Sequence, residues 1–414
     1  MCYLIMRYMK YKIIKKCQIC NNRLFNFLDL GKQPLCDDLT EKPNSSNFFK
    51  LKVSYCKKCL TAFQKYNIEK KVLFPKNYHY RSANTNDVVE GMKDLVKSSK
   101  KYCITLKDKT VLDIGCNDGT LLNFFKKEGC KTYGIEPTGA WIEAKKKGHH
   151  IFNDYFDLRA AKKLKKIIKN IDIITFTNVF AHIEDLKNLL ASLKMIINKN
   201  TLIIIENHYL GEVIKKNQFD TFYHEHPRTY SLQSFYKIAK LLKTSLIDYK
   251  FVKRYNGNIR VYLRGNNLSF KSYKNIKKDL KEERIIINRI KGFQKKVDDW
   301  KLNKKILLDK IIKINGPLPA KAFPGRASIL INLLQLNNNH ISYIYEKNLS
   351  LKTNKYAPGT NIKILKEKYF NLKEIKKGVI INLAWHISKE IKDYLRYKLK
   401  YKGKIIDIIS KSDF

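Results

Sequence analysis

A short strand, a glycine turn and the start of a helix follow one another between Thr110 and Leu122, and this order constrains the fold most strongly. The apolar run TVLDI leads directly into Gly115, and Gly119 follows four residues later, so the backbone can approach a ligand closely there. Three further short apolar runs, KTYGIE, IDIITFTN and TLIIIEN, are separated by segments of helical length. Buried strands that alternate with helices predict an α/β fold with a doubly wound parallel sheet.

A second, smaller α/β domain is expected at the C-terminus. Residues 272–313 have a long helical pattern, and the following stretch, Asn315–Ser328, is dense in Gly and Pro and is predicted to be a loop. ILINLLQL then begins a second alternation of strands and helices, with ISYIYE, GVIINLAW and KGKIIDI as its later strands. We therefore expect three domains, in residues 1–72, 73–271 and 272–414.

The nine cysteines lie in the first third of the chain, and four of them form two Cys-x-x-Cys pairs. Cys17 with Cys20, and Cys56 with Cys59, would each place two thiolates on one tight turn, which suits a tetrahedral Zn²⁺ site. Four soft ligands leave no open position, so the predicted role of the zinc is structural. Two alternatives remain at this point: four unrelated buried cysteines, or Cys36 as a substitute ligand.

The glycine turn and the strand ends after it form a candidate cofactor site. No Lys-Ser or Lys-Thr pair follows the turn, which excludes a P-loop, and the glycine spacing does not fit dinucleotide binding. An acidic residue at the end of the second strand is placed to accept hydrogen bonds from ribose hydroxyls. The ordered set of turn, acidic residue, aspartate-aromatic pair and Asn-x-x-x-His favours S-adenosylmethionine. The predicted cofactor residues are Asp113, Gly115, Asn117, Asp118, Gly119, Glu136, Asp154, Phe156 (or Tyr155 in its place) and Asn178.

A dense group of acid and base side chains lies in FDTFYHEHPRTYS, from Phe219 to Ser231. The segment follows the run TLIIIEN, so it is expected on the rim where the strands end, near the cofactor. Tyr223, His224, Glu225 and His226 suit proton abstraction, with a histidine as the base and the glutamate orienting or tuning it. The alternative is that His-Glu-His binds a cation.

Together these motifs resemble the sugar C-methyltransferases that act on nucleotide-linked 4-keto-deoxy sugars. The match covers nearly the whole chain. It includes the four cysteines with FLDLGKQPL, the run VLDIGCNDGTLL with GIEPT and NVFAHIED, the hallmark Tyr-His-Glu-His at Tyr223–His226, and YAPGTNIKI near the C-terminus. The resemblance implies a class I Rossmann-like methyltransferase domain between a small zinc-binding domain and a C-terminal Rossmann-like domain.

The resemblance also implies roles for individual residues. His226 would take a proton from the carbon next to the ketone, and Tyr223, Glu225 and His182 would stabilise or orient the enolate. Tyr78 and Tyr80 would close the site. The enolate would then be methylated on carbon by S-adenosylmethionine, with structural Zn²⁺ elsewhere in the chain.

The chain departs from the family where a Gly-Ala-x-Ala-Lys-Gly turn is usual. It reads GPLPAKAFPGRAS, which keeps Lys321 but has Ala322 where glycine is expected. Asn256-Gly-Asn-Ile-Arg260 also differs mildly from the usual Gly-Gly-Ser-x-Arg. These changes leave open which sugar and which nucleotide are bound.

The formal net charge of +46 invites a nucleic-acid interpretation, but the excess is mostly lysine spread along the whole chain. We therefore expect no nucleic-acid partner, no membrane span, a cytoplasmic location and a monomer or homodimer. O- or N-methylation of a sugar or small metabolite is the alternative function, and an RNA methyltransferase is a more distant one.

Overall fold

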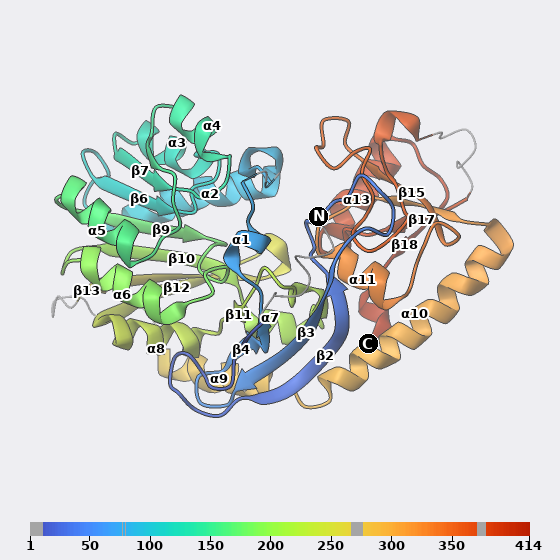
Figure 1. Ribbon diagram of the computed structural model, residues 1–414, viewed down its shortest axis with the longest axis horizontal. Coiled ribbons are helices and arrows are strands. Elements are labelled where there is room, and N and C mark those ends of the chain that lie inside the picture. Colours follow the sequence, from blue (N-terminus) through green and yellow to red (C-terminus); the bar gives the residue numbers. More distant parts are fainter. Residues whose placement is uncertain (1–10, 77, 79, 266–275, 371–377) are drawn as a thin grey trace.

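The computed structural model describes residues 11–76, 78, 80–265, 276–370 and 378–414. Two parallel-stranded sheets lie on either side of a strongly curved N-terminal sheet (Figure 1). The order of domains along the chain is therefore not their order in space, because the N-terminal strands lie between the two later domains.

The central sheet has seven strands in the order β12-β13-β10-β9-β6-β7-β8. Five are parallel, and β13 and β12 are antiparallel additions at one edge. The predicted runs form β6, β7, β9 and β10 as expected, while the edge pair was not predicted. The strands are β6 (Thr110–Ile114), β7 (Lys131–Ile135), β8 (His150–Phe152), β9 (Ile173–Thr177), β10 (Leu202–His208), β12 (Thr244–Val252) and β13 (Asn258–Gly265).

Amphipathic helices cover both faces of this sheet. Side-chain caps from Asp157 and Asp185 begin α5 and α6, and a Ser231–Ser234 capping box begins α8. The helices are α2 (Asn86–Ser99), α3 (Thr120–Lys127), α4 (Trp141–Lys146), α5 (Leu158–Ile167), α6 (Leu186–Ile196), α7 (Leu210–Lys215) and α8 (Leu232–Leu242).

The N-terminal sheet has the order β11-β4-β3-β2 and takes one strand from far along the chain. β11 (Arg228–Thr229) pairs with β4 (Thr61–Gln64), so backbone hydrogen bonds join the segment after His226 to the region that carries the four paired cysteines. The other elements are β1 (Lys12–Ile13), β2 (Phe25–Pro34), β3 (Phe48–Cys56), β5 (Tyr66–Asn67) and α1 (Lys70–Leu73).

The C-terminal sheet is parallel, in the order β16-β15-β14-β17-β18. Its first strand, β14, lies inside the stretch predicted to be a loop, so that prediction was wrong. Pro319 is tolerated there because the pairing of β14 with β15 shifts register between Leu318 and Ala320. The strands are β14 (Leu318–Lys321), β15 (Ile341–Glu346), β16 (Ile364–Lys366), β17 (Val379–Asn382) and β18 (Lys404–Asp407).

ILINLLQL, which was expected to begin the second alternation as a strand, lies largely in helix α11 (Ala327–Leu333). Nearly every residue of this helix is buried, so it lacks the polar face that would have revealed a helical period. The last α-helix of the described residues is α13 (Ser388–Asp393), and a short π-helix (Tyr394–Lys398) and a 3₁₀ turn (Lys411–Asp413) follow it.

The long helical pattern is divided into α9 (Ile276–Asn288) and α10 (Phe293–Asn315). Gly292, at φ +79°, separates them. The α9 carboxylate of Glu283 accepts hydrogen bonds from the amides of Leu232 and Gln233 at the start of α8, so α9 packs beside the central sheet. The boundary at residue 272 remains a prediction.

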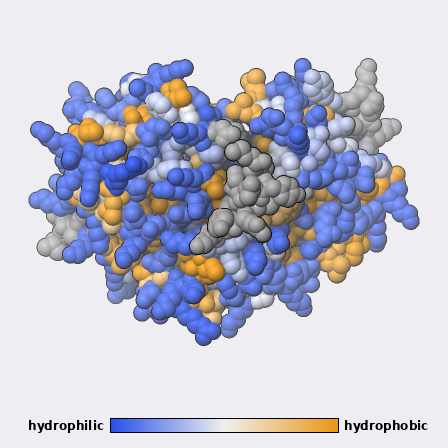
Figure 2. All heavy atoms as spheres, in the orientation of Figure 1, coloured by the Kyte–Doolittle hydropathy of each residue, from blue (hydrophilic) through white to orange (hydrophobic). Residues whose placement is uncertain are grey.

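The N-terminal sheet shares its core with the C-terminal domain. Leu51 and Val53 of β3 belong to the same buried cluster as Trp300 of α10 and Ile329 of α11. The face shown in Figure 2 is mostly hydrophilic, with scattered apolar residues. Within the described ranges, no helix combines the length and apolarity needed to cross a membrane.

Candidate active site and metal centre

The four predicted zinc ligands come together. The Sγ atoms of Cys17, Cys20, Cys56 and Cys59 lie within 4.8 Å of one another, and no other such group of three or more His, Cys, Asp or Glu occurs among the described residues. Tetrahedral Zn–S bonds of about 2.3 Å would separate the sulfurs by roughly 3.8 Å, so this donor set fits Zn²⁺. Cys36 lies elsewhere, where its sulfur accepts a hydrogen bond from Ser328.

The glycine turn lies between the carboxyl ends of β6 and β9. Gly115 has φ +71°, and a Cβ there would lie 2.6 Å from Val179 Cγ2. Gly119 has φ +76°, and its Cβ would lie 2.9 Å from His149 and 3.0 Å from Ala144. Glycine suits both positions because of the positive φ and the crowding by the protein's own side chains, and the predicted approach to a ligand stays a prediction. β6 leads to β7 on one side and β9 to β10 on the other, so this is the switch point at which parallel sheets bind ligands.

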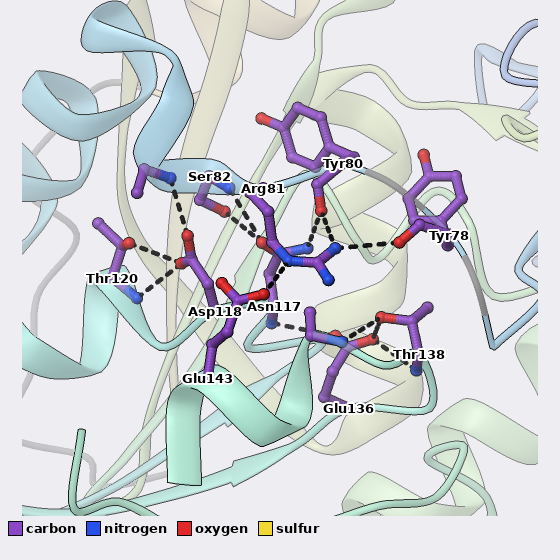
Figure 3. Close-up of polar contacts among 12 residues, drawn as sticks. Tyr78, Tyr80, Arg81, Ser82, Asn117, Asp118, Thr120, Glu136, Thr138 and Glu143 are labelled. Carbon is purple, nitrogen blue, oxygen red and sulfur yellow. Dashed lines mark hydrogen bonds and ion pairs between the residues drawn. The ribbon is translucent and has the colours of Figure 1, made fainter. Parts of the chain in front are cut away.

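Two predicted cofactor carboxylates lie at this switch point. Asp113 accepts a hydrogen bond of 2.7 Å from Thr175 Oγ1, and burial raises its pKa to about 7. Glu136 accepts from the amide of Asn117 at 3.0 Å and from the amide and hydroxyl of Thr138 (Figure 3). Burial raises the pKa of Glu136 as well.

The side chains of Asn117 and Asp118 bind an earlier segment of the chain. Asn117 accepts from the Ser82 amide at 2.9 Å and donates to the Tyr80 carbonyl at 3.2 Å. Asp118 accepts from the Ala83 amide at 2.9 Å and from the Thr120 hydroxyl at 2.6 Å. Both predicted cofactor residues therefore also hold the segment that carries Tyr80.

The remaining predicted cofactor residues lie apart from the turn or have other partners. Asp154 borders a cavity of about 110 Å³. It forms an ion pair with Arg159, whose Nη2 lies 2.9 Å from each carboxylate oxygen. Phe156 is buried and packs edge-on against Phe176. Asn178, at φ 55°, follows β9 and accepts from Asn258 at 3.1 Å. The roles predicted for these three residues stay predictions.

His226 lies at the centre of a buried group of aromatic rings. Its ring centroid is 4.1 Å from that of Tyr223, 4.9 Å from His182 and 5.1 Å from His208. Its Nδ1 is 3.1 Å from the Thr221 carbonyl oxygen, which can only accept. Nδ1 therefore carries the proton, and the lone pair of Nε2 faces the Tyr223 hydroxyl at 3.0 Å.

Burial lowers the pKa values of these histidines. That of His182 falls to about 4 and that of His208 to about 3, and that of His226 lies well below its ordinary value. The neighbouring histidines add to the effect on His226. All three rings are accordingly neutral at neutral pH.

Glu225 and Tyr78 meet at an N-terminal loop rather than at His226. The Glu225 carboxyl accepts from the Cys36 amide at 3.2 Å, and the Tyr78 hydroxyl donates to Asp37 at 2.9 Å. Burial, together with the charge of Asp37, raises the pKa of Glu225 to about 8. A glutamic acid at this position holds its proton at neutral pH.

His224 lies against the N-terminal sheet. Its ring packs edge-on against Phe49 of β3, with centroids 5.9 Å apart, and burial lowers its pKa to about 4. The structure thus brings His226, Tyr223 and His182 together, and places Glu225 and His224 against the N-terminal sheet.

Several residues at the site were not predicted. His208 ends β10, and Tyr255 lies between it and Tyr80, with its ring centroid 5.3 Å from that of His208 and its hydroxyl 3.3 Å from that of Tyr80. Arg326 forms an ion pair of 3.0 Å with Asp220. The polar end of the strand run IIIENH was the available signal for His208. No sequence signal links Arg326 to Asp220, because the pair joins two domains.

Three family models match the chain in succession. "Putative zinc binding domain" matches residues 17–74, "Methyltransferase domain" residues 88–242, and "C-methyltransferase C-terminal domain" residues 254–409. The C-methyltransferase NovU of Streptomyces niveus is 22% identical over 406 residues, which are 95% of this chain and 95% of that protein.

Two solved structures match the chain over less than half of its length. The PH0226 protein of Pyrococcus horikoshii is 16% identical, with a TM-score of 0.37 over 47% of this chain and 98% of that one. The magnesium protoporphyrin IX methyltransferase of Synechocystis is 17% identical, with a TM-score of 0.35 over 44% of this chain and 84% of that one.

Proposed function

Since the chain belongs to the S-adenosylmethionine-dependent C-methyltransferases with an N-terminal zinc-binding domain, we propose that it methylates a carbon atom of a nucleotide-linked 4-keto-deoxy sugar. The environment of His226 carries this proposal. Carbon is a poor nucleophile until a base removes a proton from it, whereas an oxygen or nitrogen acceptor needs less help. A buried base surrounded by hydrogen-bonding groups suits the harder reaction.

His226 is the proposed base, and it acts through Nε2. The hydrogen bond from Nδ1 to the Thr221 carbonyl fixes the ring and makes Nε2 the basic nitrogen. In this structure Nε2 accepts from the Tyr223 hydroxyl, and this hydroxyl would turn to the ketone oxygen when Nε2 takes the proton. Since the ring is neutral at neutral pH, Nε2 can accept the proton from the carbon next to the ketone. The negative charge that then develops on the ketone oxygen stabilises the new imidazolium beside it.

The neighbouring side chains are proposed to stabilise the enolate oxygen. The Tyr223 hydroxyl and the ring of His182 both contact His226, so they would be close to an oxygen formed next to the proposed base. Donors that are already in place when the charge develops lower the barrier. Glu225, protonated at neutral pH, would support this group as a neutral donor, with Tyr78 and Tyr80 closing the site.

S-adenosylmethionine supplies the electrophilic methyl group when it is bound. We propose that it lies at the switch point of the central sheet, because positive-φ glycines and two buried carboxylates meet there. Asp113 would accept from its ammonium group and Glu136 from its ribose hydroxyls. The further proposed contacts are Gly115, Asn117, Asp118, Gly119, Asp154, Phe156 and Asn178.

The C-terminal sheet is the proposed site for the nucleotide part of the acceptor. Its switch point lies between β14 and β17, and the loops after these strands carry Arg326 and Trp385. Both side chains bind Asp220, Arg326 at 3.0 Å and Trp385 at 2.8 Å. Asp220 precedes His226 by six residues, so a cation and an indole ring lie near the proposed base. These groups suit a phosphate and a nucleobase.

The test is a product analysis. Purified protein is incubated with methyl-labelled S-adenosylmethionine and a 4-keto-6-deoxy nucleotide sugar. We expect a product that is heavier by one CH₂ unit, with the label on a carbon next to the ketone. His226→Ala should reduce turnover by about 10²–10⁴-fold. His150→Gln, a change at an exposed histidine stacked on Tyr133, is the control. A label found on oxygen or nitrogen would contradict the proposal.

A further inference from the structure

Arg81 binds the backbone of both tyrosines that are proposed to close the site. Its guanidinium donates to the Tyr78 carbonyl at 3.0 Å and to the Tyr80 carbonyl at 2.9 Å (Figure 3). Its Nε donates to Glu143 of α4 at 2.6 Å. One arginine thus fixes the backbone of the two tyrosines relative to a helix of the central sheet.

The residues next to Arg81 are bound to the glycine turn. Asn117 and Asp118 together hold the Tyr80 carbonyl, the Ser82 amide and the Ala83 amide. Asn117 itself donates its backbone amide to Glu136, the carboxylate proposed for the cofactor ribose. A displacement of the turn would therefore act on residues 80–83 through these hydrogen bonds.

The opposite side of the same segment faces the proposed base. The Tyr80 hydroxyl contacts that of Tyr255 at 3.3 Å, the Tyr255 ring packs on His208, and His208 packs on His226. Tyr78 reaches Asp37, whose charge acts on Glu225. Residues 80–83 therefore lie between the turn and the group of rings around His226.

We infer that Arg81 is a positioning residue that couples occupancy of the cofactor turn to the placement of Tyr78 and Tyr80 on the acceptor side. The direction of this coupling toward an acceptor rests on the proposed function. Coupling between two sites is reciprocal, so a bound cofactor orders residues 80–83 and an ordered segment tightens cofactor binding. The consequence is ordered binding, in which the cofactor enters first and completes the acceptor site.

Hydrogen exchange of the full-length, zinc-loaded protein tests this inference without any acceptor. The probe is S-adenosylhomocysteine, at a concentration that saturates protection of a peptide spanning the turn at 113–119. In the native protein we expect it to slow exchange in a peptide covering residues 80–84 by about tenfold. In Arg81→Gln and in Glu143→Gln the turn should still be protected, while protection of residues 80–84 is lost. Arg81→Lys, which keeps the charge but not the fork of donors, should retain part of it.

Lys109→Gln is the matched control, because it removes an ion pair with Asp172 in the same domain that contacts neither the turn nor the tyrosines. This control should behave as the native protein does. Equal protection of residues 80–84 in the native protein and in Arg81→Gln would overturn the inference, as would ligand protection confined to the turn in the native protein. Because no sugar is present, failure of the proposed acceptor chemistry would leave this result unchanged, and the two can be told apart.

Discussion

The two parallel sheets of this protein build their switch points in the same way. The residue directly after the first strand is Gly115 in the central sheet and Ala322 in the C-terminal sheet, with φ +71° and +62°. Each donates its amide to the end of the neighbouring strand, Gly115 to Ile135 at 2.8 Å and Ala322 to Tyr345 at 3.1 Å. The two sheets therefore have the same backbone turn after their first strand. This conformation favours glycine, but only the central sheet has glycine at this position.

A carboxylate supports each turn. Glu136 accepts from the Asn117 amide, and Glu346 accepts from the Phe323 amide. The difference lies in what approaches the first residue of the turn: Val179 is so close to Gly115 that no Cβ fits, whereas Ala322 carries one. In the central sheet glycine is therefore favoured both by the positive φ and by the nearby Val179 side chain. In the C-terminal sheet only the positive φ favours glycine. The two turns thus share a backbone geometry and differ in the side chains around them.

The largest effect on ligand binding should follow from adding one methyl group to the central turn. In Gly115→Ala the new Cβ would lie 2.6 Å from Val179 and would hold a strained backbone. A cost of roughly 1–3 kcal/mol at the turn should weaken S-adenosylhomocysteine binding by about 5- to 150-fold. Isothermal titration measures this directly. Unchanged affinity would mean that the cofactor does not approach this turn, and the comparison of the two sheets would fail.

At the C-terminal switch point we expect a substitution to weaken binding of the acceptor and to leave binding of the cofactor unchanged. Arg326→Gln removes a charged donor, so KM for the nucleotide sugar should rise about tenfold while S-adenosylhomocysteine affinity stays the same. Arg326 also neutralises buried Asp220, so the single variant should lose stability. The double variant Asp220→Asn/Arg326→Gln removes both charges and should recover stability without recovering KM. If Arg326→Gln changed only the affinity for S-adenosylhomocysteine, the cofactor would bind at the C-terminal sheet, which would contradict the proposed assignment.

Glu225 should make stability depend on pH. Its pKa is raised from 4.5 to about 8 in the folded protein, so the folded state holds this proton more tightly than the unfolded state does. Its contribution to stability should fall as pH rises from about 4.5 to 8, on the order of 5 kcal/mol in all, and then level off. Glu225→Gln should flatten this slope. Urea unfolding at pH 5.5, 7 and 8.5 measures it, and identical slopes in both proteins would contradict the assignment.

The smallest effect should be a gain. Ala322→Gly relieves the positive φ of a residue with a side chain, so the free energy of unfolding should rise by up to about 1 kcal/mol. The same change restores the residue that the family resemblance predicts at this position. Thermal unfolding of both variants measures this: Ala322→Gly should raise the melting temperature, and Gly115→Ala should lower it. A loss of stability in Ala322→Gly would mean that the methyl group packs favourably enough to outweigh its strain.

Much of the fold was readable from the sequence because it depends on local order. The strands β6, β7, β9 and β10 were predicted by short β-branched runs, and the four cysteines by their spacing. β14 and α11 were mistaken because a proline was taken as a strand breaker and a fully buried helix shows no period. The antiparallel edge of the central sheet has no local signature either.

The site was readable only in part, since its geometry is made by distant segments. The sequence identified His226, Tyr223 and His182, which converge. It did not reveal that Glu225 faces Cys36, or that Arg81 binds Glu143. Those contacts depend on how the N-terminal sheet and α4 pack, which no run of neighbouring residues encodes.

Exchange of hydrogen for solvent deuterium at the carbon next to the ketone tests the central claim most directly. A 4-keto-6-deoxy nucleotide sugar is incubated with the protein in D₂O together with S-adenosylhomocysteine, which fills the cofactor site but carries no methyl group to transfer. Proton removal by His226 predicts deuterium at that carbon in the presence of the native protein, at the background rate with His226→Ala, and at the native rate with His150→Gln. Deuterium uptake by His226→Ala at the native rate, or no uptake by a protein that still methylates the sugar, would contradict the account.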